Sequence, residues 1–130
     1  MNKMRIAIPT KAYAGLEDSV SEAFGKAKTF TIVDVEDDRV ENVKVIDNPA
    51  ASYEHGAGPV AVKTLVDLEV NLVMGVEFGP GASSLLVQHN IQRLPVKANL
   101  KVADSIKEAQ TELRIEDFSQ TKLNTLNSAR

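Results

Sequence analysis

Cysteine and tryptophan are absent from this sequence, and aromatic residues make up only 5% of the chain. Without cysteine the protein has no disulfides, thiolate nucleophiles, cysteine-type zinc sites or ordinary cysteine-ligated iron–sulfur clusters. Basic residues are not in excess either. The net charge is -3 and the isoelectric point is about 5.4, which argues against broad nucleic-acid binding because such binding needs a basic surface.

A long apolar run is also missing, and no cationic start leads into an apolar stretch. The sequence therefore indicates neither a signal peptide nor a membrane span, and we expect a cytoplasmic protein. What is present is ordinary for a globular protein: 130 residues, 43% of them hydrophobic and 25% charged, enough to bury a core in one domain. We expect this domain over residues 1–113, followed by a polar C-terminal tail over residues 114–130.

The first half of the chain has the pattern of three strands. Apolar, β-branched and aromatic residues predict strands over residues 4–9, 29–35 and 40–46. The polar turn between the second and third strands favours an antiparallel hairpin. Before that hairpin we expect a loop over residues 10–19 and one helical turn over residues 20–25.

In the second half, hydrophobic residues recur at helical spacing between two further strands. Helices are predicted over residues 59–69 and 80–89, and strands over residues 71–76 and 91–96. The inner face of the first helix is expected to carry Val62, Leu65 and Val66, and that of the second Ala82, Leu85 and Leu86. A third helix is predicted from the spacing of Val102, Ile106, Ala109 and Leu113, which form its inner face. Asn90 is predicted to end the second helix in the left-handed conformation, with Ile91 making the hydrophobic contact that follows.

The order of these elements predicts an α/β fold. Right-handed connections through the helices give a mixed five-stranded sheet in the order 3-2-1-4-5, with strand two antiparallel, in the three-layer ribonuclease-H-like arrangement. In open sheets of this kind, ligands bind beyond the carboxyl ends of the parallel strands, where the strand order reverses. That crevice lies between strands one and four. The loops over residues 10–19, 50–58 and 77–81 are expected to line it.

Two glycine-rich segments fall in those loops: His55-Gly56-Ala57-Gly58-Pro59 and Gly75-Val76-Glu77-Phe78-Gly79-Pro80-Gly81. In each, a proline stands at the predicted first position of a helix, where its missing N–H has no helical partner. The glycines leave the free N–H groups of the first helical turn open to a ligand, and helix N-termini favour anions. We therefore predict an anionic-cofactor site that comprises His55, Gly56, Gly58, Gly79, Gly81 and Lys11.

Each of these candidates also has a simpler explanation. The glycines could serve only to permit tight turns. Lys11 and Lys26 flank the proposed crevice and could neutralise an anion, but each could also be an ordinary surface lysine. His55 is the candidate metal ligand, because imidazole binds iron and other transition metals. An exposed loop histidine without a ligand fits this position equally well.

Other side chains near the crevice are weaker candidates. Glu54 and Glu77 could add oxygen ligands to a metal, although loop carboxylates are usually solvated. His89 is expected to be partly buried at the end of the second helix, where the helix dipole favours it. Tyr13 and Phe78 either form apolar walls of the pocket or simply pack against the core.

The order and spacing of several short segments resemble the dinitrogenase iron–molybdenum cofactor biosynthesis family, also called nitrogenase accessory factor-like. These segments are Ser21-Glu22-Ala23-Phe24-Gly25-Lys26-Ala27, Asn48-Pro49, the two glycine-rich segments, a stretch near Val102, and Glu108-Ala109. The resemblance implies a ribonuclease-H-like fold and binding or carriage of an iron–molybdenum or other metal–sulfur cofactor, or an accessory role in its assembly. It also implies cofactor-assembly or acceptor proteins as partners. Because cysteine is absent, any cluster must be held by histidine, carboxylate or backbone donors.

Motifs of catalysis are missing beside the predicted site. A ribonuclease-H-type nuclease needs carboxylates on the first and fourth strands to hold divalent metals, but the segments RIAIP and NLVMGV have none. The sequence has no Walker A motif, and HGAGP is not a dinucleotide-binding fingerprint. We therefore expect no enzyme activity. Two hypotheses remain: a non-catalytic metal–sulfur cofactor carrier, and a small regulatory or interaction domain that binds a simple anion or a protein partner in the same crevice.

Overall fold

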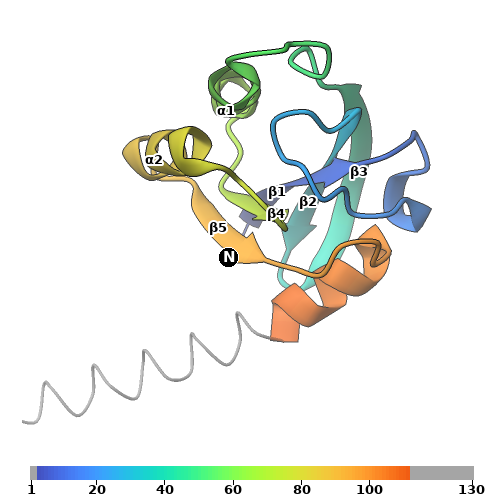
Figure 1. Cartoon of the computed structure of the whole chain (residues 1–130). Coiled ribbons are helices and arrows are strands. Elements are labelled where there is room, and N and C mark those ends of the chain that lie inside the picture. The colour runs from blue at the N-terminus through green and yellow to red at the C-terminus, as the bar shows by residue number, and fades with distance from the viewer. Residues whose placement is uncertain (1–2, 112–130) are drawn as a thin grey trace, which may run out of the picture.

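The computed structural model describes residues 3–111 of the chain (Figure 1). Its strands are β1 (Lys3–Thr10), β2 (Thr29–Glu36), β3 (Arg39–Asp47), β4 (Leu72–Gly75) and β5 (Gln92–Pro95). Its helices are α1 (Ala57–Asp67), α2 (Pro80–Gln88), the short 3-10 helix η1 (Gly15–Glu17) and a last helical segment over residues 102–111. The predicted domain end at residue 113, the tail over residues 114–130 and the inner-face residue Leu113 lie outside the described residues.

The strands form one mixed five-stranded sheet in the order β3-β2-β1-β4-β5. β2 is antiparallel to both β1 and β3, whereas β4 is parallel to β1 and β5 is parallel to β4. The predicted strand order and the antiparallel second strand are therefore confirmed. The ribonuclease-H-like label itself stays a prediction.

Helices cover both faces of this sheet (Figure 1). On one face, Leu65 of α1 and Leu86 of α2 belong to a buried cluster with Phe30 of β2. On the other face, Val102 and Ile106 of the last helical segment belong to a second cluster. Strand residues alternate between the two clusters because successive side chains of a strand point to opposite faces. Within residues 3–111, every helix is too short or too polar to cross a lipid bilayer.

Asp and Asn residues with a left-handed backbone conformation follow two of the elements, β2 and α2. Asp37 and Asp38 connect β2 to β3 with φ angles of 50° and 70°, the pair of positive angles that a type I′ hairpin turn needs. Asn90 follows α2 with a φ of 59°. The next residue, Ile91, is buried and donates its backbone N–H to the Leu86 carbonyl at 2.9 Å, so the predicted end of this helix is confirmed.

Residues 20–25 do not form the predicted helical turn. Val20 and Ala23 form isolated β-bridges, and bends and a turn make up most of the remaining segment. We call residues 20–26 the strap. The Val20 N–H donates to the Leu100 carbonyl at 2.9 Å, and the Ser21 N–H donates to the Pro9 carbonyl at 2.8 Å. Pairing with distant segments thus satisfies backbone groups that a local helix would otherwise pair internally.

The start of α1 also differs from the prediction. This helix begins at Ala57, with Gly56 as its N-cap, and not at Pro59. Proline is tolerated there because no N–H group in the first helical turn has an acceptor within the helix. In α2, Pro80 does occupy the first helical position.

Candidate functional site

The N-termini of α1 and α2 have unpaired backbone donors. Neither N-cap, Gly56 or Gly79, receives a side-chain capping hydrogen bond. The first-turn N–H groups of each helix have no acceptor within the helix. Within residues 3–111, those of Ala57, Gly58, Gly81 and Ala82 have no acceptor elsewhere either. Two positive helix ends with free donors are a suitable surface for an anion.

The two helix starts lie against one another. A β-carbon placed on Gly58 would be only 3.3 Å from the β-carbon of Ala82. Small residues at both positions therefore allow the first turn of α1 to approach the first turn of α2. The free donors of the two helices form one site because of this contact.

The strap completes the site on a third side. The Glu77 N–H donates to the Glu22 carbonyl, and the Phe24 N–H donates to the Glu77 carbonyl, both at 3.2 Å. A β-carbon placed on Gly25 would lie 3.0 Å from the amide nitrogen of Gly58, so the strap touches the start of α1 through bare backbone.

Phe24 anchors the strap over the carboxyl ends of β1 and β4. Its side chain is 1% exposed, and its ring lies 5.4 Å from that of Phe30 and 5.7 Å from that of Phe78. The predicted ligand crevice between strands one and four is thus covered by the strap. The open space lies beside it, toward the starts of α1 and α2.

That space is a groove of about 360 Å³. Its lining consists of the strap, the start of α1 and the start of α2: Ala23, Phe24, Gly25, Lys26, Gly56, Ala57, Gly58, Pro59, Glu77, Phe78, Gly79, Gly81 and Ala82. All four predicted glycines are present. The loop over residues 10–19 contributes none of these residues, and the strap takes its place.

The glycines of the groove differ in the structural constraint that requires a glycine at each position. Gly25 and Gly58 are in close contact with neighbouring atoms, and Gly56 and Gly79 have positive φ angles of 76° and 80°. Gly81 has neither constraint: a β-carbon there would meet nothing within 4 Å, and its φ is not in the left-handed range. A glycine in the first turn of a helix lowers helix stability relative to alanine, so Gly81 lacks a structural reason.

Of the basic and histidine residues considered for the site, Lys26 lines the groove, whereas Lys11, His55 and His89 lie outside the lining. Lys11 is exposed and donates a hydrogen bond from Nζ to the side-chain oxygen of Asn99. His55 is exposed and immediately precedes Gly56, the N-cap of α1. His89 is exposed at the C-cap of α2, so the expectation that it is partly buried is wrong: Leu86, one turn earlier, fills the inner face instead.

Tyr13 does not form a wall of the groove either. Its hydroxyl donates to an oxygen of Asp47, which raises the pKa of Tyr13, and the Nζ of Lys28 lies 5.5 Å from its ring centre. Phe78 does line the groove, and it also packs against Phe24, so both readings of this residue hold.

Side chains that could bind a metal are scarce at this site. Across residues 3–111, no group of three or more histidine, cysteine, aspartate and glutamate side chains is placed to hold a metal ion. The groove lining has only two charged residues, Lys26 and Glu77. The donor set therefore suits an anion held by backbone N–H groups better than a bare metal ion.

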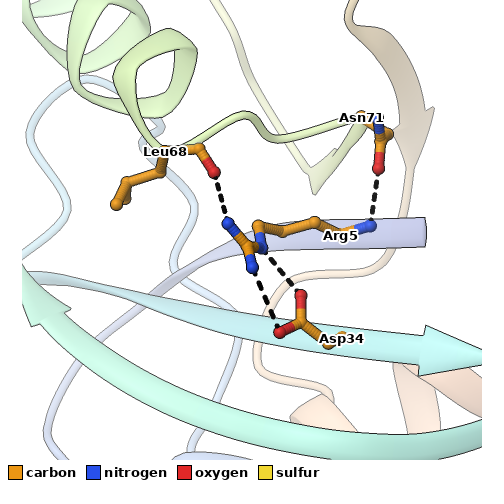
Figure 2. Close-up of polar contacts among 4 residues, drawn as sticks. All are labelled: Arg5, Asp34, Leu68 and Asn71. Carbon is orange, nitrogen blue, oxygen red and sulfur yellow. Dashed lines mark hydrogen bonds and ion pairs between the residues drawn. The ribbon is translucent and has the colours of Figure 1, made fainter. Parts of the chain in front are cut away.

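A separate polar cluster surrounds Arg5 (Figure 2). Arg5 stands near the start of β1, whereas the strap bonds to Pro9 near the other end of that strand. Arg5 of β1 donates from Nε to Asp34 of β2 at 2.7 Å and from an Nη to the Leu68 carbonyl at 2.7 Å. Its backbone N–H donates to the side chain of Asn71 at 2.7 Å. The hydrogen bond from Arg5 lowers the pKa of Asp34. Because the guanidinium is already paired, we assign this cluster a structural role.

Comparison with known proteins identifies the family. The model of the dinitrogenase iron-molybdenum cofactor family matches residues 2–112. The chain belongs to this family. An uncharacterized protein from Methanocaldococcus jannaschii is 29% identical over 115 residues, which are 88% of this chain and 92% of that protein.

Solved structures of similar proteins support the family assignment. The apo form of the orange protein from Desulfovibrio gigas superposes with a TM-score of 0.77 at 25% identity, covering 84% of this chain and 88% of that one. A candidate NifB protein from Thermotoga superposes with a TM-score of 0.70 at 29% identity, covering 83% of this chain and 88% of that one.

Proposed function

We propose that this protein binds and carries an anionic metal–sulfur cofactor, of the iron–molybdenum or a similar type, in the groove between α1 and α2. Its role is that of a carrier or accessory factor in cofactor assembly, with assembly or acceptor proteins as partners. The observation that carries the proposal is Gly81. This glycine faces open space beside free N–H donors, where neither packing nor backbone conformation requires a glycine.

The groove fits such a ligand by its donors and its walls. The N–H groups of Gly58, Gly81 and Ala82 would donate to the outer sulfides, and both helix dipoles would stabilise the negative charge. Lys26 adds a positive charge on the strap. Alanine and phenylalanine side chains line the remaining walls, which suits a large anion that holds water weakly.

The same lining supports a role without catalysis. Lys26 and Glu77 are the only titratable side chains among the groove residues. No histidine, serine or threonine accompanies them, so the groove lacks a nucleophile with an adjacent base. When bound, the cofactor would supply the redox chemistry, and the protein would hold it and pass it on.

Anaerobic titration with tetrathiomolybdate, a soluble molybdenum–sulfur dianion, tests this proposal through its visible absorbance. We expect saturable binding by the wild-type protein. Gly81→Ala should weaken it by about ten- to a hundredfold, because the added methyl group blocks hydrogen bonds to a charged ligand. Ser84→Ala, on the exposed side of the same helix, is the matched control and should bind normally.

Two outcomes would contradict the proposal. If the wild-type protein does not bind tetrathiomolybdate, the groove is not a site for molybdenum–sulfur anions. If sulfate or phosphate at equal concentration displaces the probe completely, the groove is a general anion site, which favours the small regulatory domain instead.

A further inference from the structure

Glu77 places a negative charge in a groove that otherwise favours anions. It is the only residue in the lining with a carboxylate, and the lining contains no other side chain that binds transition metals well. Glu54, the other carboxylate beside the glycine-rich segments, is exposed but does not line the groove. The structure therefore separates two residues that look equivalent in the sequence.

The backbone of Glu77 is fixed on both sides. Its N–H donates to the Glu22 carbonyl and its carbonyl accepts from the Phe24 N–H, both at 3.2 Å, in an isolated bridge between Ala23 and Glu77. By contrast, no hydrogen bond or ion pair of the Glu77 carboxylate is recorded within residues 3–111. The backbone of Glu77 is thus fixed at the edge of the groove, and its side chain is exposed, so the carboxylate oxygens are available to a ligand.

A free carboxylate affects two kinds of anionic ligand in opposite ways. It repels an anion that presents only sulfur atoms, because like charges raise the free energy of the complex. It attracts an anion that also presents a metal atom with an exchangeable position, because a carboxylate oxygen is a good ligand for iron and similar metals. The sign of the effect therefore depends on what the ligand presents to Glu77.

We infer that Glu77 determines the specificity of the groove: it selects metal–sulfur anions that carry a coordinatively open metal, and it supplies one oxygen ligand to that metal. This inference rests on the proposed function of the groove. In the binding step, a carboxylate oxygen forms a bond to the metal while a labile water or chloride leaves it. No electron is transferred. The sulfides remain hydrogen-bonded to the N–H groups of α1 and α2.

Binding of two probes to Glu77→Gln tests the inference. The first probe is tetrathiomolybdate, which presents only sulfur. The second is tetrathiomolybdate bound to ferrous iron, whose iron carries exchangeable water or chloride. We expect Glu77→Gln to bind the first probe about two- to threefold more tightly, since a screened repulsion is removed. It should bind the iron-bearing probe at least about tenfold more weakly, since a metal ligand is lost.

Glu54→Gln is the matched control, with the same change of charge outside the groove. It should leave both affinities within about twofold of the wild-type values, because exposed charges at a distance are screened. If Glu77→Gln shifts both probes in the same direction, or if Glu54→Gln gives the same pattern, the assignment to Glu77 is overturned. Failure of the wild-type protein to bind either probe would instead overturn the proposed function itself, so the two failures are distinguishable.

Discussion

Gly58 of α1 and Ala82 of α2 lie in contact, with only 3.3 Å between the Ala82 β-carbon and the place where a β-carbon of Gly58 would be. The distance between the free donors of the two helices depends on this contact. Gly25 of the strap approaches Gly58 from another side through backbone atoms alone. Three segments that are far apart in sequence thus meet at residues with little or no side chain.

Gly25→Ala is expected to destabilise the fold. The new β-carbon would stand 3.0 Å from the amide nitrogen of Gly58 and 3.2 Å from its Cα, and backbone atoms cannot turn aside as a side chain can. We expect the free energy of unfolding to fall by about 1–3 kcal/mol, the usual effect of overpacking. Urea denaturation measures the change.

Gly81→Ala is the comparison for that experiment, because a β-carbon at Gly81 meets nothing within 4 Å. Its stability should equal or exceed that of the wild type by up to about 1 kcal/mol, since alanine is the better helix former. Equal destabilisation by both substitutions would contradict the division of the glycines into packing and ligand-facing positions.

Asp34→Asn tests the polar cluster around Arg5. The hydrogen bond from Arg5 lowers the pKa of Asp34 below its ordinary value of 3.8. A carboxylate with a lowered folded-state pKa stabilises the fold above its unfolded-state pKa, and this contribution is lost as the pH falls through the folded-state pKa. The variant should therefore lose about 1 kcal/mol near pH 7, discounted for the solvent exposure of the pair.

Below the folded-state pKa of Asp34, the variant and the wild type should converge in stability, because the wild-type carboxyl is then protonated as well. Urea denaturation near pH 7 and at the lowest pH that leaves the wild type folded gives both values. Asp67→Asn is the control, since its ion pair with Lys63 is fully on the surface, with side-chain exposures of 60% and 74%. A difference between Asp34→Asn and the wild type that does not shrink with falling pH would exclude the ion pair as its cause.

Much of the fold follows from local patterns. The apolar runs of β1, β2 and β4, the helical spacing of Leu65 and the left-handed preference of Asn90 are properties of short segments, and the structure agrees with each of them. The strap could not be recognised in this way. Val20 and Phe24 take their hydrogen-bond partners, Leu100 and Glu77, from distant parts of the chain. Such partners leave no periodic signal in the strap itself.

The parts of the site that depend on local sequence were predictable, and the parts that depend on distant contacts were not. Gly56 and Gly79 precede helices, and a helix start with a glycine and a proline is visible in the sequence. Lys11 was expected in the groove because it follows a parallel strand, but Nζ turns to Asn99 instead. Lys26 lines the groove because the strap pairs with Pro9 and Glu77 and lies against Gly58 at the start of α1. Residues 21–27 belong to the family resemblance, and this was the one sequence signal that could have pointed to the strap, because its local pattern predicted a helical turn instead.

Asp18→Ala should loosen the loop over residues 10–19 without affecting the groove. The Asp18 side chain is buried and accepts backbone N–H bonds from Ser19 at 2.8 Å, Ala12 at 3.1 Å and Ala14 at 3.3 Å. Removing this acceptor leaves several donors unpaired and should cost about 1–3 kcal/mol. Tetrathiomolybdate affinity should stay unchanged at a temperature where the variant is folded, because the loop does not line the groove. A parallel loss of affinity would show that the loop belongs to the site.

The last prediction concerns the two histidines. His55 precedes Gly56, which lines the groove, and we expect His55→Ala to weaken binding of the iron-bearing probe through loss of an imidazole ligand. Stability should change by no more than about 0.5 kcal/mol, since the side chain is exposed. His89→Ala is the control: it is exposed at the far end of α2, so neither binding nor stability should change. Anaerobic absorbance titration and urea denaturation of both variants provide the comparison. Unchanged affinity in His55→Ala would leave the N–H groups of α1 and α2, with Lys26 and Glu77, as the binding groups.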